Sequence, residues 1–320
     1  MNKYAIVTDS ASDLCKEYRE ANGIDYAQTM MSWKKEDGQN IETGASLDWD
    51  FISYKDFYNL LRGGTRVYTA QVTIQNYLDV FEPHLKKGED VLYVACSSGL
   101  SASINIARML AEGELKEKYP DRKIVVFDSL RAGMAQGMLV MLAVDLKNQG
   151  KSLEENVEIL EKEKRSYKEV GIPETLSYLK RAGRVTAGAA FFGNIISLKP
   201  ILVFDDKGSN IAVEKAIGKK KAFNRMAEMI KDDIVDPENQ EIFLLSGDCN
   251  EEDVNYFKQA ILNQVKVKEI TVVPLGPVVG ASSGPGTIIV PGPDEAPTTG
   301  PNGTTVIVFT LTWFNIAFLK

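Results

Sequence analysis

The sequence predicts an α/β protein of two domains, the first built on a mostly parallel sheet with helices on both faces and the second a mixed α/β domain. The chain has 320 residues, 44% of them hydrophobic, whereas single cores stop growing at roughly 250 to 300 residues. Apolar runs without polar alternation are separated by helical stretches through the first half, as in parallel sheets that are buried on both faces. The pattern changes around Gly171 and Pro173, which predicts domains of residues 1–165 and 166–320.

The first half repeats a strand-then-helix order three times. The run from Ala5 to Val7 ends in TDSASD, where Ser12 is a candidate cap for a helix that stops at Asn22 and Gly23. The next two strands are DVLYVAC and KIVVFDS, each followed by a long helical stretch. Ligands bind at the carboxyl ends of such strands. The polar turns TDSASD, CSSGLS and Asp128–Ser129 are therefore expected to converge.

The second half mixes strands and helices. Ser152 and Glu155 form a capping box for a charge-rich helix that runs to about Val170, and PETLSYLKRAG predicts a helix with Pro173 in its first turn. The elements expected after that are the strand LKPILVF with a turn at 206–208, a helix at about 217–233, a strand at 241–246, a helix from Asn250, and the strand EITVVP. Residues 291–303 are expected to form a linker, and 304–319 one or two buried strands, with a membrane-touching end as the alternative.

Charge and cysteine content exclude several classes of protein. The net charge is -7, and the longest basic cluster is Lys219–Lys221, so nucleic acid and anionic membrane surfaces are not expected partners. Three widely spaced cysteines fit neither a disulfide framework nor a metal site, which indicates a reducing compartment. The opening MNKYAIVTDS leaves no room for a signal peptide, and we expect a cytoplasmic protein.

A serine-rich turn follows the second strand, with four serines at positions 97, 98, 101 and 103. A strand-to-helix turn of this kind attracts anions through free N–H groups and the helix dipole. Neither G-x-x-x-x-G-K-[ST] nor G-x-G-x-x-G occurs, which argues against nucleotide binding. Helix capping by serine is the purely structural alternative.

A second candidate chemistry is a serine hydrolase or transferase with Ser282 as nucleophile in GASSG. It needs a base, and the only histidine is His84, which is expected at a solvent-exposed helix end far upstream. Asp9 and Asp13 are expected to bridge backbone amides, with a site role as the alternative. No cluster has metal-ligand spacing, so no metal or cofactor is predicted.

Seven segments, in order, resemble the DegV family, whose members bind fatty acids. They resemble its D-S-x-x-D-L, T-S-Q-P-S, S-S-x-L-S-G-T, V-V-D-S, T-L-x-Y-L-x-x-G-G-R-I, L-L-x-I-K-P-I-L and G-P-x-I-G-x-H-x-G-P-G motifs. The segments in this chain are VTDSASDL (7–14), TAQVT (69–73), SSGLSAS (97–103), VVFDS (125–129), TLSYLKRAGRV (175–185), NIISLKPIL (194–202) and GPVVGASSGPG (276–286).

The resemblance implies a long-chain fatty acid in the cleft between two α/β domains, presented by a non-enzymatic carrier to a separate fatty acid kinase. It implies no cofactor other than the bound acid and no stable membrane insertion. The carboxylate would be held by Thr69 and Ser101, with Ser97 and Ser98 shaping the turn. Arg184 is expected near the headgroup, and Ser282 stands where the family has histidine.

The chain departs from the family at several motif positions. Ala70, Val72, Ala102 and Ala182 replace a serine, a proline and two glycines of the motifs, and Ser282 removes a partner of the headgroup and of the kinase step. The apolar slot is expected along FFGNIISLKPIL. Its candidate lining residues are Phe191, Phe192, Ile195, Ile196 and Leu198. The tail, residues 291–320, is atypical, and the resemblance does not cover it.

Overall fold

The computed structural model describes residues 3–186 and 197–293 and divides into two compact units. The first unit contains the described chain up to Ser53, Gly64–Lys164 and Gly276–Val279. The second contains Tyr54–Gly63, Arg165–Leu275 and the described chain from Gly280 onward. A short segment of the first half therefore belongs to the second unit.

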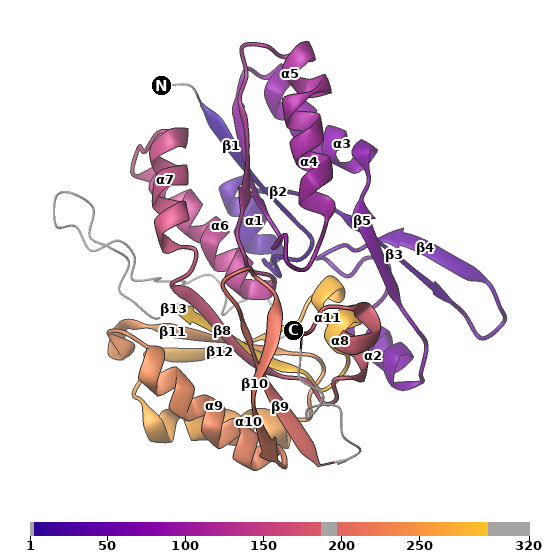
Figure 1. Ribbon diagram of the computed structural model, residues 1–320, viewed down its shortest axis with the longest axis vertical. Coiled ribbons are helices and arrows are strands. Elements are labelled where there is room, and N and C mark those ends of the chain that lie inside the picture. Colours follow the sequence, from indigo (N-terminus) through magenta and orange to yellow (C-terminus); the bar gives the residue numbers. More distant parts are fainter. Residues whose placement is uncertain (1–2, 187–196, 294–320) are drawn as a thin grey trace. The chain divides into compact units, whose positions relative to one another are not determined.

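The first unit is built on a four-stranded parallel sheet of order β2-β1-β6-β7 (Figure 1). Every residue of β1 and of β6 is buried, which explains their uninterrupted apolar runs. The strands are β1 (Tyr4–Asp9), β2 (Asp25–Ala27), β6 (Asp90–Ala95) and β7 (Ile124–Asp128).

Helices cover both faces of this sheet, with α3 and α4 on one side and α6 and α7 on the other (Figure 1). Val7, Val91 and Tyr93 of the sheet pack in one cluster with apolar residues of α3 and α4. Almost all of α6 is buried. The helices of this unit are α1 (Lys16–Asn22), α3 (Ile74–Lys86), α4 (Ser103–Glu112), α5 (Glu114–Lys118), α6 (Gly133–Asn148) and α7 (Leu153–Glu163).

A separate three-stranded antiparallel sheet, of order β4-β3-β5, also belongs to the first unit. It is formed by β3 (Thr29–Lys34), β4 (Asn40–Gly44) and β5 (Tyr68–Val72). Nothing in the strand-then-helix pattern predicts it. It matters for the site because β5 carries Thr69.

The second unit has a six-stranded mixed sheet of order β10-β9-β8-β13-β11-β12. Only β11 and β12 pair in parallel, and the other neighbours are antiparallel. Its strands are β8 (Tyr167–Ile172), β9 (Leu198–Phe204), β10 (Asn210–Ile217), β11 (Glu241–Ser246), β12 (Glu269–Pro274) and β13 (Ile288–Pro293).

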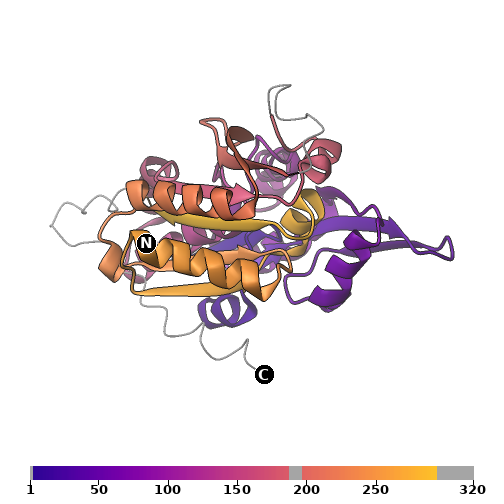
Figure 2. The same cartoon turned by 90° about the horizontal axis from the view of Figure 1, so that it is seen from below.

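Helices α9 and α10 lie side by side along this sheet (Figure 2), and Phe223 and Phe257 stack between them with ring centroids 4.9 Å apart. The aromatic stack and the apolar faces of α9 and α10 belong to one core with β8, β11 and β13. The helices of the unit are α2 (Tyr54–Arg62), α8 (Ser177–Ala182), α9 (Lys219–Asp233), α10 (Glu251–Gln264) and the 3-10 helix η2 (Pro237–Asn239). Helix α11 (Pro277–Ser283) is divided, its residues up to Val279 belonging to the first unit and the rest to the second.

Tyrosine hydroxyls attach α2 to the second unit. Tyr54 donates to the carbonyl of Ser246 (2.6 Å), and Tyr58 donates to that of Leu275 (2.9 Å). Tyr178, from α8, donates to the carbonyl of Leu61 at the end of α2 (2.8 Å). These bonds satisfy carbonyls at strand and helix ends, so α2 groups with a sheet far from it in sequence.

Most predicted helix ends are confirmed, but several local predictions are wrong. The Ser152–Glu155 capping box is present, yet α7 stops at Glu163 because Tyr167–Ile172 pairs as a strand with β13. The helix predicted from Pro173 begins at Ser177. Ser12 does not cap α1, whose N-cap is Cys15.

The C-terminal predictions are tested only in part. Pro291–Pro293, predicted as linker, pair with β8 because the antiparallel ladder continues through them. The tail beyond residue 293 and the slot residues Phe191, Phe192, Ile195 and Ile196 lie outside the described residues. Within the described ranges, no helix has the length and apolar character needed to cross a membrane.

His84 is not at an exposed helix end, as predicted, but is buried at the end of α3. Its Nε2 lies 2.9 Å from Oδ2 of Asp25, and its Nδ1 lies 2.9 Å from Oε2 of Glu89. These two carboxylates, Asp25 first, raise the pKa of His84, and the histidine in turn lowers the pKa of Asp25. The His84 ring thus links α3 to β2.

We predict that His84→Gln destabilises the protein by about 1 to 3 kcal/mol at pH 6, because charged hydrogen bonds are lost. A raised histidine pKa adds stability in full below the ordinary value of 6.5, and this stability is lost as the pH rises through the folded-state pKa. Urea unfolding at pH 6 and pH 9 should therefore show a smaller difference at pH 9. Lys118→Gln, which removes an exposed ion pair with Glu82, is the control. An equal loss for His84→Gln at both pH values contradicts the account.

Candidate functional site

The three polar turns at the carboxyl edge of the parallel sheet converge as predicted. Oδ2 of Asp9, at the end of β1, accepts hydrogen bonds from the Tyr93 hydroxyl and the Cys96 amide, both at 2.8 Å. The amide of Ser98 donates to Oδ1 of Asp128, at the end of β7 (3.2 Å). Carboxylates at the ends of β1 and β7 thus bond to backbone amides of the turn that follows β6.

The serine corner, residues 97–103, is a tight turn organised by Ser97. This side chain is fully buried, and its Oγ accepts from the amide of Gly99 (3.1 Å). Its carbonyl accepts from the amides of Leu100 (3.0 Å) and Ser101 (2.9 Å). Ser98 is exposed. Ser97 therefore organises the backbone of the corner, and that Ser97 and Ser98 shape it for a ligand stays a prediction.

Ser101 is half-buried, and its hydroxyl donates to Oγ of Ser103 at 3.0 Å. Ser103 is buried, and its Oγ also accepts from the amide of Val72 on β5 (3.1 Å). The serine corner is therefore joined to the strand that carries Thr69, three residues before Val72. Sequence reasoning did not select Ser103, although it is the fourth serine of the corner.

Thr69 lies on β5 opposite Met31 of β3 and is half-buried. Thr69, Ser97, Ser98 and Ser101 all belong to the first unit, whereas Arg184 and Ser282 belong to the second. Arg184 follows α8 and donates from Nη1 to the carbonyl of Ala182. That all six side chains serve one ligand stays a prediction.

A buried polar network lies beneath the serine corner. Tyr77 donates to the carbonyl of Ser103 (3.0 Å), and its oxygen lies 3.1 Å from that of Tyr93. Tyr93 donates to Asp9, whose other oxygen accepts from the amide of Ala11 (3.0 Å). Burial raises the pKa of Asp9, while these hydrogen bonds oppose the rise. Asp9 bridges backbone amides, in agreement with its expected structural role.

Asp13 is buried with a backbone φ of 53°, a left-handed value that is uncommon for a non-glycine residue. Neither carboxyl oxygen meets hydrogen-bond geometry with a group in the described ranges, although the backbone of Gly276 lies close by. A Cβ on residue 276 would stand 2.1 Å from Oδ1 of Asp13, so only glycine fits there. Burial raises the pKa of Asp13 to about 8.

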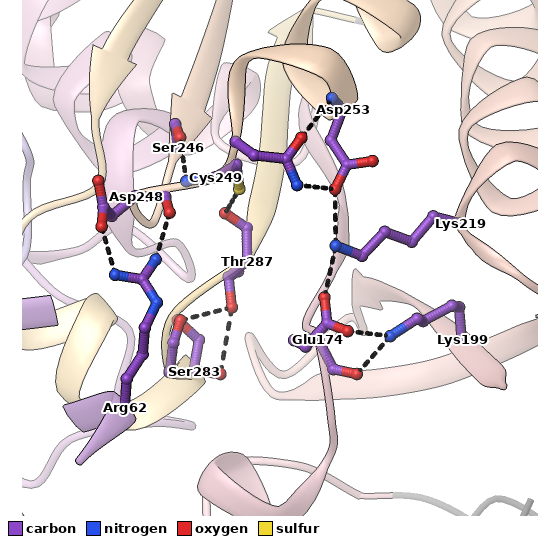
Figure 3. A network of polar contacts seen from close by, with 12 residues as sticks. Arg62, Glu174, Lys199, Lys219, Ser246, Asp248, Cys249, Asp253, Ser283 and Thr287 are labelled. Carbon is purple, nitrogen blue, oxygen red and sulfur yellow. Dashed lines mark hydrogen bonds and ion pairs between the residues drawn. The ribbon is translucent and has the colours of Figure 1, made fainter. Parts of the chain in front are cut away.

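The second unit has its own polar cluster, drawn in Figure 3, at the edge where β11 ends. Lys199 and Lys219 both contact Glu174, at 2.7 and 2.8 Å, and Lys219 also contacts Asp253 at 2.6 Å. Asp248 pairs with Arg62 and with Lys55. Because opposite charges are matched in these contacts, the cluster is a structural ion-pair network.

Among the described residues, the candidate nucleophiles, bases and metal ligands do not have the environments that catalysis requires. Burial raises the pKa of the Cys249 thiol and of the Cys15 thiol to about 11, so both stay protonated at neutral pH. Ser282 lies inside α11, not at a strand-to-helix turn as a nucleophile elbow requires. Both ring nitrogens of His84 are occupied by carboxylates. The described ranges contain no group of three or more histidine, cysteine and acidic side chains placed to hold a metal ion.

We predict that Asp13→Asn stabilises the protein at pH 8 by about 1 kcal/mol or more. With a folded pKa of about 8 and an ordinary value of 3.8, wild-type Asp13 keeps its proton when folded and releases it when unfolded. Wild-type stability should therefore fall between pH 5 and pH 8 in urea unfolding, and the variant should lack that fall. Asp121→Asn, at an exposed site of the same unit, is the control. The same pH slope in Asp13→Asn and wild type would refute the proposed ionisation.

Known proteins are similar to this chain in sequence and in fold. Residues 3–290 match the family profile described as "Uncharacterised protein, DegV family". A DegV domain-containing protein of Clostridium perfringens is 35% identical over 290 residues, which are 91% of this chain and 97% of that protein.

Two solved structures are also similar. One is a DegV family protein from Thermus thermophilus described for its fatty acid binding, with 27% identity, a TM-score of 0.77, and 91% of this chain and 99% of that chain covered. The other is DegV of Bacillus subtilis, described as a fatty acid binding protein, with 25% identity, a TM-score of 0.75 and the same coverage. Because the profile match and the curated relative both span about nine-tenths of the sequence, the chain belongs to the DegV family.

Proposed function

We propose that the protein binds a long-chain fatty acid and carries it without chemical change. The observation that carries this proposal is the serine corner, where hydroxyls and backbone amides gather at the carboxyl edge of the sheet. The relatives from Thermus thermophilus and Bacillus subtilis, described as fatty-acid-binding, support it.

Uncharged donors suit a carboxylate headgroup. A carboxylate accepts hydrogen bonds at two oxygens, and hydrogen bonds to a charged group are stronger than those between neutral groups. In the proposal, Thr69 and Ser101 donate to the acid, and Ser97 and Ser98 shape the loop. The family resemblance adds Arg184 and Ser282 to the proposed headgroup set.

The acyl chain supplies most of the binding free energy. Burying roughly 14 methylenes at ~0.8 kcal/mol each gives on the order of 11 kcal/mol before the costs of ordering. The chain therefore needs a long apolar slot. Residues 191–202 are the proposed lining, of which only the part from Ser197 lies in the described ranges.

The proposed role is that of a carrier in the cytoplasm. A separate fatty acid kinase would receive the bound acid and form the acyl phosphate, so the protein itself needs no cofactor or metal. The only histidine of the chain, His84, has both ring nitrogens occupied by carboxylates, which favours a carrier over the Ser282 hydrolase.

Organic extraction of the purified protein followed by mass spectrometry tests the proposal. We predict close to one long-chain fatty acid per chain. Thr69→Ala combined with Ser101→Ala should weaken binding by about 10- to 100-fold, since two hydrogen bonds to a charged group are lost. Ser152→Ala, which removes the cap of α7, is the control and should bind as wild type. Repeated absence of lipid, or unchanged affinity in the double variant, would rule the proposal out.

Ser282 provides a test of the kinase-coupled role. Where the family motif has histidine this chain has serine, so we predict that Ser282→His increases acyl-phosphate formation when a fatty acid kinase and ATP are supplied. Thin-layer chromatography of labelled product measures the yield. Ser283→His, one residue along in α11, is the matched control. Equal yields from wild type and Ser282→His would show that residue 282 does not limit the transfer.

A further inference from the structure

We propose that Ser103 and Tyr77, neither of which belongs to the predicted headgroup set, are the positioning residues that set the orientation of the Ser101 hydroxyl for a carboxylate. This inference rests on the proposed fatty-acid function and deepens it. It comes from the hydrogen-bond arrangement around the start of α4, where β5, α3 and the serine corner meet.

Ser103 connects the two elements that carry the predicted carboxylate donors. Its Oγ accepts from the Val72 amide at 3.1 Å and so holds β5, the strand of Thr69. The same oxygen lies 3.0 Å from Oγ of Ser101, and the Ser103 amide donates to Oγ of Ser101 at 3.3 Å. Ser103 is only 5% exposed, so water does not substitute freely for these partners.

A count of protons and lone pairs shows how this arrangement accommodates a ligand. A hydroxyl has one proton and two lone pairs. The Val72 amide occupies one lone pair of Ser103, which leaves one lone pair and the proton available toward Ser101. In the structure, Ser101 donates to Ser103. When the Ser101 proton turns to a carboxylate, Ser103 can donate to Ser101 in its place.

After that exchange the proton and both lone pairs of the Ser101 hydroxyl take part in hydrogen bonds. Its oxygen accepts from the amide and the hydroxyl of Ser103, and its proton points at the ligand. Hydrogen bonds in such a chain polarise one another, so donation from Ser103 makes Ser101 a better donor. A methyl group at residue 103 would remove this donor and leave the Val72 amide without its buried acceptor.

Tyr77 holds Ser103 from beneath. It donates to the Ser103 carbonyl at 3.0 Å, and its oxygen lies 3.1 Å from that of Tyr93, which donates to Asp9 at 2.8 Å. Burial is the main cause that raises the pKa of Tyr77 and the pKa of Tyr93, so both keep their protons at neutral pH. The two rings pack edge to face with centroids 5.5 Å apart. The start of α4 is thus fixed to the end of β1.

The test compares two probes of equal chain length, hexadecanoic acid and methyl hexadecanoate, which differ in the charge of the head. Dissociation constants are measured by displacement of a fluorescent fatty acid. For Ser103→Ala we expect acid affinity to fall about 3- to 10-fold while ester affinity stays within about twofold of wild type. Tyr77→Phe should also lower the affinity for the acid relative to the affinity for the ester. This second variant tests the proposal even if Ser103→Ala does not fold.

Ser152→Ala is the matched control, because it is the same substitution at a helix start of the same unit and also removes a backbone hydrogen bond. It should leave the acid-to-ester ratio unchanged. If wild type binds the acid and both Ser103→Ala and Tyr77→Phe keep its ratio, the positioning role is overturned and the proposed function stands. If wild type binds neither probe, the proposed function is overturned and the inference falls with it.

Discussion

The buried carboxylate of Asp9 is the constraint on which the candidate site depends. An ionised group removed from water is costly unless several donors surround it. Here the donors come from separate parts of the chain: the Ala11 amide, the Tyr93 hydroxyl, the Cys96 amide and the side chain of Gln136 on α6. The hydrogen bonds to this one carboxylate hold the end of β1, the end of β6 and helix α6 together.

Hydrogen bonds that start at this carboxylate hold the uncharged donors of the serine corner in place. Tyr93 and Tyr77 continue the hydrogen bonds from Asp9 to the first residue of α4, and Ser103 continues them to β5 and Ser101. No strong base or thiolate is needed in such an arrangement. Hydroxyls and amides can hold an acid group reversibly, in keeping with the carrier role that we propose.

Sequence reasoning recovered what local pattern and sheet geometry determine. The carboxyl ends of parallel strands share one edge, so the convergence of the turns after β1, β6 and β7 could be predicted. Helix ends marked by a strong local signal, Gly23 and the Ser152–Glu155 capping box, were also correct. Ser97 shapes its turn through its own neighbours in sequence, which is why its role was accessible.

The features that were missed depend on distant partners. Pairing with β13 turns Tyr167–Ile172 into a strand although the residues resemble a helix extension, and bonds to Ser246 and Leu275 place α2 in the second unit. His84 is buried because its ring nitrogens find partners in Asp25, far away in sequence, and in Glu89. Ser103 gains its importance from Val72, which no motif links to it.

We propose that the acid group is held by the serine corner and β5. A crystal structure of the protein with bound hexadecanoic acid tests this most directly. We predict carboxylate oxygens within about 3 Å of Oγ of Ser101 and of Oγ1 of Thr69, with the acyl chain away from water. A carboxylate facing solvent, or bound by residues remote from the serine corner, would contradict it.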